Sequence, residues 1–430
     1  MPGIVACHGF TSLIQNVVGR SSMDERKQDP GFSSWRRRLF LIFSVALLIR
    51  FVFILTLDDG FYFADAPVYS AAASHLVEHG EFPKAYGRAP LYPLFVAGVY
   101  RLAGEGVIFL RILQAVLGAC VAVLIAVIGK RAGGPGVGTI AGMLWSVYPM
   151  GIFIAGLVYP TTLVTFLLAC GVLCLLSNPG HHRYTARVAL AGLFFGLVVL
   201  AKPIVLGTVV LIAFWILFWR RSGGVFLASI FLFTTLASLV PWTVRNAYVY
   251  DRLIPIEARL LNKDRVTVWA KRPADPDESE NIIFRYIGRI ANRFPGEFAS
   301  FFELYPRRVN LLKQSIRDRV HERNPRFVRY TIFGSEPVIV VSVVSVGSIF
   351  AFALIGVWAM WREKDKRREF SLLVLMIMSF ALSYAATWGK IRYRIPVDPY
   401  IIILSSFGVI CILSRLVMLK SLVQRKCAPG

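Results

Sequence analysis

Apolar residues gather in long stretches along the chain, separated by short polar turns and by two long polar segments. Each stretch has roughly the 17–25 residues that an α-helix needs to cross about 30 Å of hydrocarbon. The pattern therefore predicts an all-α polytopic membrane protein with about ten transmembrane helices. The predicted spans are Leu39–Leu57, Val107–Ile128, Val137–Val158, Thr161–Leu176, Ala186–Ala201, Ile204–Trp219, Val225–Val240, Val338–Trp361, Phe370–Ala386 and Ile395–Leu416.

Basic residues cluster at alternate ends of these stretches. The cluster Trp35–Arg38 precedes the first stretch, Lys130 and Arg131 follow the second, and residues 362–368 carry a third cluster. Loops rich in Lys and Arg stay in the cytoplasm. We therefore predict that the first helix runs outward and that both termini are cytoplasmic.

The two long polar segments divide the chain into parts. The predicted division is a cytoplasmic tail over 1–34, helices 1–7 over 35–240 with an outer loop at 58–106, an extracytoplasmic domain over 241–336, helices 8–10 over 337–418, and a cytoplasmic tail over 419–430. The first tail reads as unstructured, and the chain starts at either Met1 or Met23. In the outer loop, Pro67–His79 is amphipathic, and Pro90–Leu102 is too short to span the membrane. The first predicts a helix that lies beside the membrane, and the second predicts a re-entrant or interfacial helix.

Composition excludes a soluble protein. Hydrophobic residues make up 56% of the chain and charged residues 17%, whereas soluble domains have about 45–50% and about 25%. The formal net charge of +23 would suggest a nucleic-acid partner in a soluble protein. Here the basic residues flank apolar stretches and no nucleic-acid motif accompanies them. We expect membrane lipids as partners and no nucleic acid.

Three aspartates follow the first predicted span. Asp58 and Asp59 lie at its outer end, and Asp65 lies just beyond. Carboxylates at a membrane boundary cost desolvation energy, which favours a functional reason for them. A solvated helix end is the alternative for Asp58 and Asp59. Asp65 precedes Ala66 and Pro67, so it fits either a catalytic base or an N-cap, and the sequence leaves both open.

A series of short motifs begins in this loop and continues along the rest of the chain. They are Asp65-Ala66-Pro67-Val68-Tyr69, Ala73, Leu76, Gly80 and Phe82, the run from Tyr86 to Phe95, Arg111-Ile112-Leu113-Gln114-Ala115, Gly118, Ala201-Lys202-Pro203, the run from Pro241 to Asn246, Leu253-Ile254-Pro255-Ile256, and Arg392-Tyr393-Arg394-Ile395-Pro396. In their order and side of the membrane they resemble the GT-C glycosyltransferases, polytopic enzymes that use polyprenyl-phosphate-linked sugars. The resemblance is to the bacterial members grouped with protein-mannosyltransferases and aminoarabinose transferases, so we expect a bacterial inner (plasma) membrane protein.

The resemblance implies a site in the first outer loop. An aspartate there would act as general base or metal partner, and on this chain it is Asp65, with Asp58 or Asp59 as alternatives. An acceptor hydroxyl or amine outside the cytoplasm would attack the anomeric carbon of the sugar, and a lipid phosphate would leave. Basic residues at the outer face are candidates for binding that phosphate, although each could instead extend to lipid headgroups. The phosphate-binding candidates are Tyr86, Arg88, Lys202, Arg245, Arg392 and Arg394.

One departure from the family pattern leaves a metal cofactor and activity open. Many relatives carry an acid at the start of the fourth helix, in a pattern like Thr-Glu-Thr-Leu, but here the stretch is Tyr159-Pro160-Thr161-Thr162-Leu163. A divalent cation therefore stays an alternative. His75, His79 and Glu78 could suggest a second metal site, but no third ligand has a fixed spacing. A transporter or lipid flippase and an inactive scaffold of the same fold are the rival functions.

Overall fold

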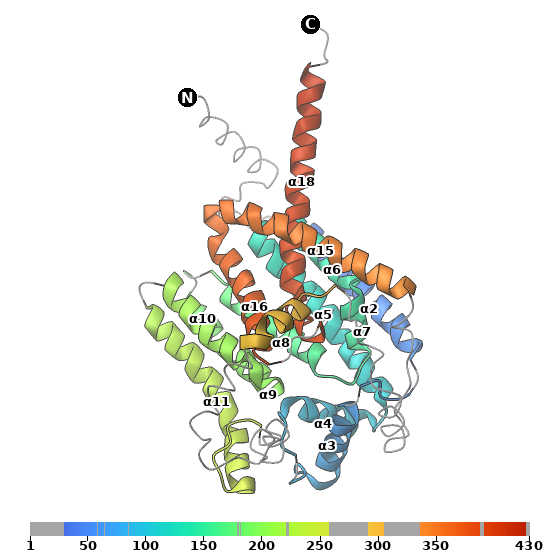
Figure 1. Cartoon of the computed structure of the whole chain (residues 1–430), viewed down its shortest axis with the longest axis vertical. Helices are drawn as coiled ribbons and strands as arrows, with labels where there is room; N and C mark the ends of the chain where they lie inside the picture. The colour runs from blue at the N-terminus through green and yellow to red at the C-terminus, as the bar shows by residue number, and fades with distance from the viewer. Residues whose placement is uncertain are drawn as a thin grey trace.

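The computed structural model describes residues 30–57, 59–63, 65–84, 86–178, 180, 182–220, 223–257, 291–304, 336–387 and 391–426. The elements within these ranges are helices, arranged as a bundle with a cap of shorter helices at one end (Figure 1). The predicted all-α polytopic membrane fold is therefore confirmed.

Helices stand at all ten positions where spans were predicted. Seven are long and apolar enough to cross a membrane: α2 (Pro30–Leu55), α5 (Val107–Gly133), α9 (Tyr184–Ala201), α11 (Gly224–Tyr250), α15 (Glu336–Arg362), α16 (Arg367–Ala385) and α18 (Asp398–Lys426). The bent pair α6 (Pro135–Ser146) and α7 (Pro149–Ala155) makes an eighth. The other two, α8 (Thr161–Leu175) and α10 (Leu206–Trp219), are apolar but shorter.

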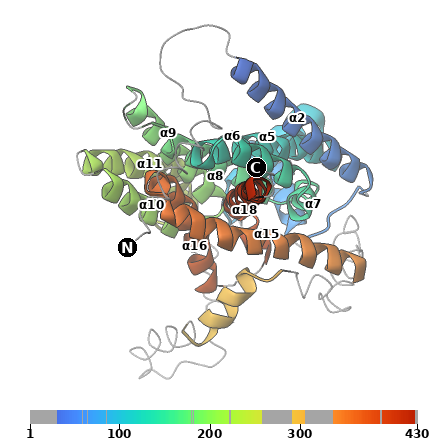
Figure 2. The ribbon, with the colours of Figure 1, turned by 90° about the horizontal axis from the view of Figure 1, so that it is seen from above.

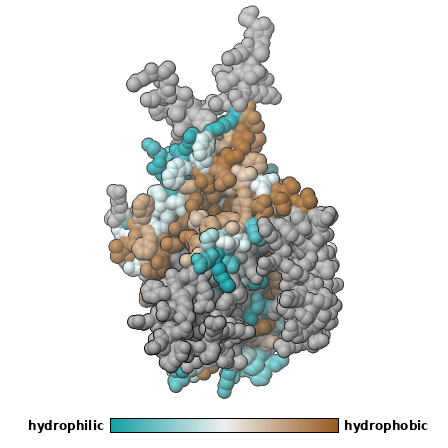
Figure 3. All heavy atoms as spheres, viewed as in Figure 1, coloured by the Kyte–Doolittle hydropathy of each residue, from teal (hydrophilic) through white to brown (hydrophobic). Residues whose placement is uncertain are grey.

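The surface of the bundle is suited to lipid. Large apolar side chains are exposed on several spans, including Phe40 on α2, Phe218 on α10, Phe233 on α11 and Leu354 on α15. Figure 3 shows apolar residues over the middle part of this face, with polar residues both in its upper part and at its lower edge. Extended apolar surface of this kind marks contact with a membrane.

At the predicted span Val137–Val158 the structure has a break, because α6 and α7 meet at an angle of 54°. Pro149 begins α7, and a proline cannot donate a hydrogen bond to continue α6. Arg50 of α2 stabilises the break: its guanidinium donates to the carbonyls of Trp145 and Ser146, each at 3.2 Å. The Arg50 side chain is fully buried, so it replaces the hydrogen bonds that the break removes.

Helix α11 continues past its predicted end at Val240. It runs through Pro241 to Tyr250, and the following turn folds back on it. The side-chain amide of Asn246 donates to the carbonyls of Ile254 and Ile256. This extension carries α11 beyond the bundle, to the end where the first outer loop lies (Figure 1).

The two helices predicted in the first outer loop are present. They are α3 (Ala66–His79) and α4 (Leu91–Ala103), which pack together, with a 2.8 Å hydrogen bond between the hydroxyls of Ser70 and Tyr100. They cap the end of the bundle opposite the C-terminal end of α18 (Figure 1).

Helix α15 crosses α18 and packs against it, with α18 seen end-on in Figure 2. A Cβ atom at Gly356 would overlap the carbonyl oxygen of Leu404, and one at Gly408 would overlap the carbonyl oxygen of Phe352. Small residues at such a crossing let two backbones approach closely in a membrane.

Candidate active site

Asp65 stands at the N-terminus of α3 but does not cap it with its side chain. Its Oδ1 atom instead accepts a 2.9 Å hydrogen bond from Nη1 of Arg88, and the two side chains form an ion pair. The carboxylate of Asp65 is 36% exposed. Asp65 was predicted to be either an N-cap or a catalytic base. Its side chain does not act as an N-cap, and its carboxylate points toward the loop that carries Arg88.

Arg88 is held between Asp65 and an aromatic ring. Its guanidinium lies 5.7 Å from the ring centroid of Tyr69 on α3. Burial lowers the pKa of Arg88, but the hydrogen bond to Asp65 and the charge of that carboxylate outweigh it, so the pKa is raised. Arg88 therefore stays protonated.

Lys202 lies at the break after α9, where its extended backbone precedes Pro203. Its Nζ atom lies 5.0 Å from the ring centroid of Tyr159 and 5.1 Å from that of Tyr393. The side chain is 8% exposed. Burial first, and then the charge of Arg392, lower the pKa of Lys202 to about 7, against the opposing charges of Asp65 and Glu257.

Arg392 contacts the same two rings as Lys202. It belongs to the single-turn helix α17 (Ile391–Arg394), and its guanidinium lies 4.9 Å from the Tyr393 ring and 5.9 Å from the Tyr159 ring. Its Nη2 atom also donates a 2.8 Å hydrogen bond to the hydroxyl of Tyr393. Burial lowers its pKa, but the neighbouring Tyr159 and Tyr393 outweigh this and raise it.

These groups form one site, which we call the outer site. It comprises Asp65, Arg88, Lys202 and Arg392 with the rings of Tyr69, Tyr159 and Tyr393. The ring centroids of Tyr69 and Tyr159 lie 6.4 Å apart. The ring that contacts Arg88 therefore packs against a ring that contacts Lys202. The charge of Asp65 acts on both Lys202 and Arg392.

The outer site is suited to an anion. Neither Lys202 nor Arg392 forms an ion pair with any carboxylate in the part of the chain that the structure describes. Two cations side by side repel each other, and aromatic walls reduce the screening by water. A bound phosphate would reduce this repulsion, while the carboxylate of Asp65 could accept a proton.

Two predicted phosphate-binding residues have a different place. Arg245 on α11 donates to the carbonyl of Pro83 and to the side chain of Asn246, and its guanidinium lies 4.8 Å from the ring of Trp242. The Tyr86 hydroxyl donates to the carbonyl of Ala89 in its own loop. These contacts bind the outer end of α11 to the first outer loop.

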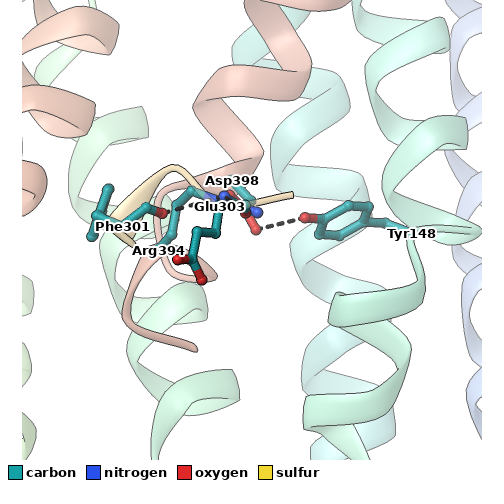
Figure 4. A network of polar contacts seen from close by, with 5 residues as sticks. All are labelled: Tyr148, Phe301, Glu303, Arg394 and Asp398. Carbon is teal, nitrogen blue, oxygen red and sulfur yellow. Dashed lines mark hydrogen bonds and ion pairs between the residues drawn. The ribbon is translucent and has the colours of Figure 1, made fainter. Parts of the chain in front are cut away.

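Arg394 is also engaged elsewhere (Figure 4). Its Nε atom donates to Oδ1 of Asp398 at 2.7 Å, and its Nη1 atom donates to the carbonyls of Phe301 and Glu303. The hydroxyl of Tyr148, at the break between α6 and α7, donates to the second oxygen of Asp398. We therefore assign Arg394 to holding the fold together rather than to the outer site.

The alternative aspartates do not join the outer site. Asp58 lies outside the described residues. Asp59 is exposed to solvent, and no hydrogen bond or ion pair joins it to another described residue. Asp65 is thus the carboxylate that the structure brings to the cations.

The residues of the outer site do not fit a divalent cation. Such an ion takes several oxygen ligands. Two carboxylates, those of Asp65 and Glu257, act on Lys202, but Asp65 is already bonded to Arg88, and Lys202 and Arg392 are two further cations. Thr161 and Thr162 stand at the start of α8, where relatives carry an acid, and their buried hydroxyls have no partner among the described residues. Among the described residues, no group of three or more His, Cys, Asp or Glu side chains could hold a metal ion.

The histidine pair of α3 has local partners. The rings of His75 and His79 stack at 4.2 Å, and their Nδ1 atoms contact the carbonyls of Glu81 and His75. Glu78 lies 3.8 Å from His79, and both side chains are more than half exposed.

Sequence reasoning missed the aromatic walls of the outer site. Tyr69 and Tyr393 lie inside motifs that resemble the family, and Tyr159 begins the stretch that departs from its pattern, but aromatic residues are common at membrane boundaries and carry little signal alone. Asp398 was also missed, although an acid at the start of a span is a recognisable cue.

No family model matches the sequence, and no curated protein matches it. Among solved structures, the oligosaccharyltransferase of Archaeoglobus fulgidus in its apo form has a TM-score of 0.57 and 12% identity, over 92% of this chain and 52% of that chain. ArnT from Cupriavidus metallidurans bound to undecaprenyl phosphate has a TM-score of 0.53 and 15% identity, over 86% of this chain and 59% of that one.

A third structure, archaeal AglB from Archaeoglobus fulgidus with an inhibitory peptide and a dolichol-phosphate, has a TM-score of 0.55 and 12% identity, over 91% of this chain and 52% of that chain. This chain thus spans a little more than half the length of these proteins. At such identities the likeness concerns the fold. The chain is an integral membrane protein with the fold of the GT-C glycosyltransferases, as its sequence motifs implied.

Proposed function

We propose that this protein is a glycosyltransferase that moves a sugar from a polyprenyl-phosphate-linked donor onto an acceptor outside the cytoplasm. The observation that carries the proposal is the pair of cations, Lys202 and Arg392, sharing the rings of Tyr159 and Tyr393 next to Asp65. A sugar phosphodiester brings the negative charge that this pair lacks. Two of the similar structures contain a lipid phosphate, undecaprenyl phosphate in ArnT and a dolichol-phosphate in AglB, which supports a lipid phosphate here.

In the proposed reaction Asp65 is the general base. Its Oδ1 atom is bonded to Arg88, and no described residue donates a hydrogen bond to its Oδ2 atom. That oxygen accepts the proton of the acceptor hydroxyl or amine while the acceptor attacks the anomeric carbon. Arg88 orients the carboxylate and adds positive charge. Lys202 and Arg392 stabilise the charge that develops on the leaving phosphate.

The location of the protein follows the same proposal. The outer site lies at the end of the bundle opposite the C-terminal end of α18 (Figure 1). With the basic clusters in the cytoplasm, both termini face that compartment and the site opens outside it, in a bacterial inner membrane. Reporter fusions at residue 430 and after Asp251 should give opposite locations.

The direct test is transfer from radiolabelled polyprenyl-phosphate sugars by the purified chain in lipid vesicles, with a panel of hexose and pentose donors. We expect transfer by the wild type and a loss of at least about 100-fold in Asp65→Asn, in line with removal of a general base. Asp59→Asn is the matched control and keeps its activity. A wild type inactive with every donor, or an Asp65→Asn variant of undiminished activity, would contradict the proposal.

A further inference from the structure

We infer that Lys202 is a catalytic acid of the outer site, whose ammonium group donates a proton to the phosphate oxygen that leaves the sugar; this rests on the function proposed above. The geometry singles out Lys202. Its Nζ atom is enclosed by two tyrosine rings at 5.0 and 5.1 Å, beside Arg392.

The charge balance of the reaction calls for such a group. A donor phosphodiester carries one negative charge. When the bond between the anomeric carbon and the phosphate oxygen breaks, its electron pair stays on that oxygen, and the product is a phosphate monoester. The second pKa of a monoester is about 6, so it bears between one and two negative charges near neutral pH. One permanently charged group, Arg392, is enough to balance the single negative charge of the donor. The additional negative charge that develops on the leaving oxygen calls for a second group that can give it a proton.

The protons balance as follows. The acceptor oxygen or nitrogen bonds to the anomeric carbon, and its proton moves to Asp65. The ammonium of Lys202 gives a proton to the leaving oxygen and becomes a neutral amine. Release of the proton from Asp65 and uptake of one by Lys202 from water restore the resting state, so no other reactant is required.

Arg88 and Arg392 are unsuited to this role. A guanidinium remains protonated throughout the physiological range, and the pKa of each of these two is raised further by its neighbours. They supply constant charge. An amine shifts its pKa readily when it is buried, and the pKa of Lys202 is lowered to about 7 by its burial and by Arg392.

Charged and titratable groups face Lys202 from every side. These are Asp65 before α3, Tyr159 before α8, Glu257 after α11, and Arg392 and Tyr393 on α17, with Tyr384 of α16 stacked on Tyr393. Within the described ranges, no carboxylate lies within ion-pair distance of its Nζ atom. A bound anion therefore raises the pKa of Lys202, so that its amine is protonated before the bond breaks.

The pH dependence of the reaction tests the inference. Because Lys202 must be protonated, kcat/KM of the wild type should fall as pH rises through about 7, the pKa in the protein without donor. The corresponding fall in kcat should come at higher pH, because the bound phosphate raises the pKa. Lys202→Arg keeps the charge but cannot give up its proton. It should lower single-turnover kcat by about 100-fold or more and lose the alkaline fall.

A second measurement does not depend on activity. Reductive methylation with ¹³C-formaldehyde and NMR of the dimethyl-lysine signals should show one lysine titrating near pH 7, absent from Lys202→Arg and shifted upward by polyprenyl phosphate. Lys130→Arg is the matched control. The Nζ atom of Lys130 also lies over a ring, 4.5 Å from the ring centroid of Trp35, but Lys130 stands in the last turn of α5 and is not part of the outer site. This substitution should leave both readouts unchanged.

The outcomes separate the two proposals. If the wild type transfers no sugar, the proposed function and the acid role both fail. If the wild type transfers sugar and folded Lys202→Arg keeps the alkaline fall, Lys202 only positions the phosphate, and the acid role alone is overturned. A lysine signal that titrates only above pH 9 would also overturn it.

Discussion

Arg394 and Asp398 form a buried ion pair at 2.7 Å, with side-chain exposures of 0% and 4%. The pair connects three distant parts of the chain, because Arg394 also binds the carbonyls of Phe301 and Glu303, and Asp398 also binds Tyr148 at the break between α6 and α7 (Figure 4). Arg392 and Tyr393 of the outer site precede Arg394 in the same short helix. The ion pair therefore holds α17, which carries Arg392 and Tyr393, in place.

Asp398→Asn should destabilise the protein strongly. Removing one partner of a buried ion pair leaves the other charge uncompensated, at a cost of about 3–5 kcal/mol. We expect a clearly lower midpoint of thermal unfolding in detergent. Glu78→Gln is the control, since Glu78 is 63% exposed and should not affect the midpoint. Equal midpoints for wild type and Asp398→Asn would contradict this prediction.

Removing both charges should be less harmful than removing one. The double variant Arg394→Met with Asp398→Leu leaves no unpaired charge, and apolar replacements of buried ion pairs are often neutral. We expect its unfolding midpoint to lie above that of either single variant. A double variant less stable than both single variants would mean that the hydrogen bonds to Tyr148, Phe301 and Glu303 matter more than the ion pair.

Arg88→Gln should lower the rate of transfer without unfolding the protein. The substitution removes the charge that orients Asp65 and adds to the field at the phosphate, and loss of one such donor costs about 10²–10³ in kcat. The measurement is single-turnover transfer together with thermal unfolding. Arg101→Gln on α4 is the control, because Arg101 is exposed. Similar losses in both variants would argue against a role for Arg88 in the site.

Sugar transfer should be insensitive to chelators of divalent cations. Arg88 already binds the carboxylate of Asp65, and three cations face the two carboxylates of Asp65 and Glu257, a set that does not suit an ion that needs several oxygen ligands. We expect equal transfer rates before and after dialysis against EDTA. A loss of activity that Mg²⁺ or Mn²⁺ restores would show that ligands outside the described residues complete a metal site.

Gly356→Ala should destabilise the packing of α15 on α18. The added Cβ atom would overlap the carbonyl oxygen of Leu404, which as part of the backbone cannot turn aside, so the helices must separate. Overpacking of this kind costs roughly 1–3 kcal/mol. Gly98→Ala is the matched control, because nothing lies within 4 Å of its Cβ and it sits within helix α4. We expect Gly98→Ala to be neutral or to stabilise the protein by up to about 1 kcal/mol, since alanine favours helices.

The sequence by itself determined the class of fold and the positions of the helices. In hydrocarbon each backbone amide must bond within its own helix, so a span is encoded locally, by the length and hydropathy of one segment. The break at Tyr148 was not predicted, although Pro149 was visible, because a proline in a span is tolerated when a neighbour satisfies the backbone. Here that neighbour is Arg50, from a different helix.

The composition of the site was decided by the tertiary structure. Asp65, Arg88, Lys202 and Arg392 were candidates from the sequence, but so were Arg245 and Arg394, and all of these were placed at the same face of the membrane. The sequence pattern of one segment does not show which basic side chains contact the same aromatic rings. Lys202 and Arg392 share one site because both contact the rings of Tyr159 and Tyr393, whereas Arg394 forms a buried ion pair with Asp398. Electrostatic effects depend on such distances and on burial, which only the packed structure provides.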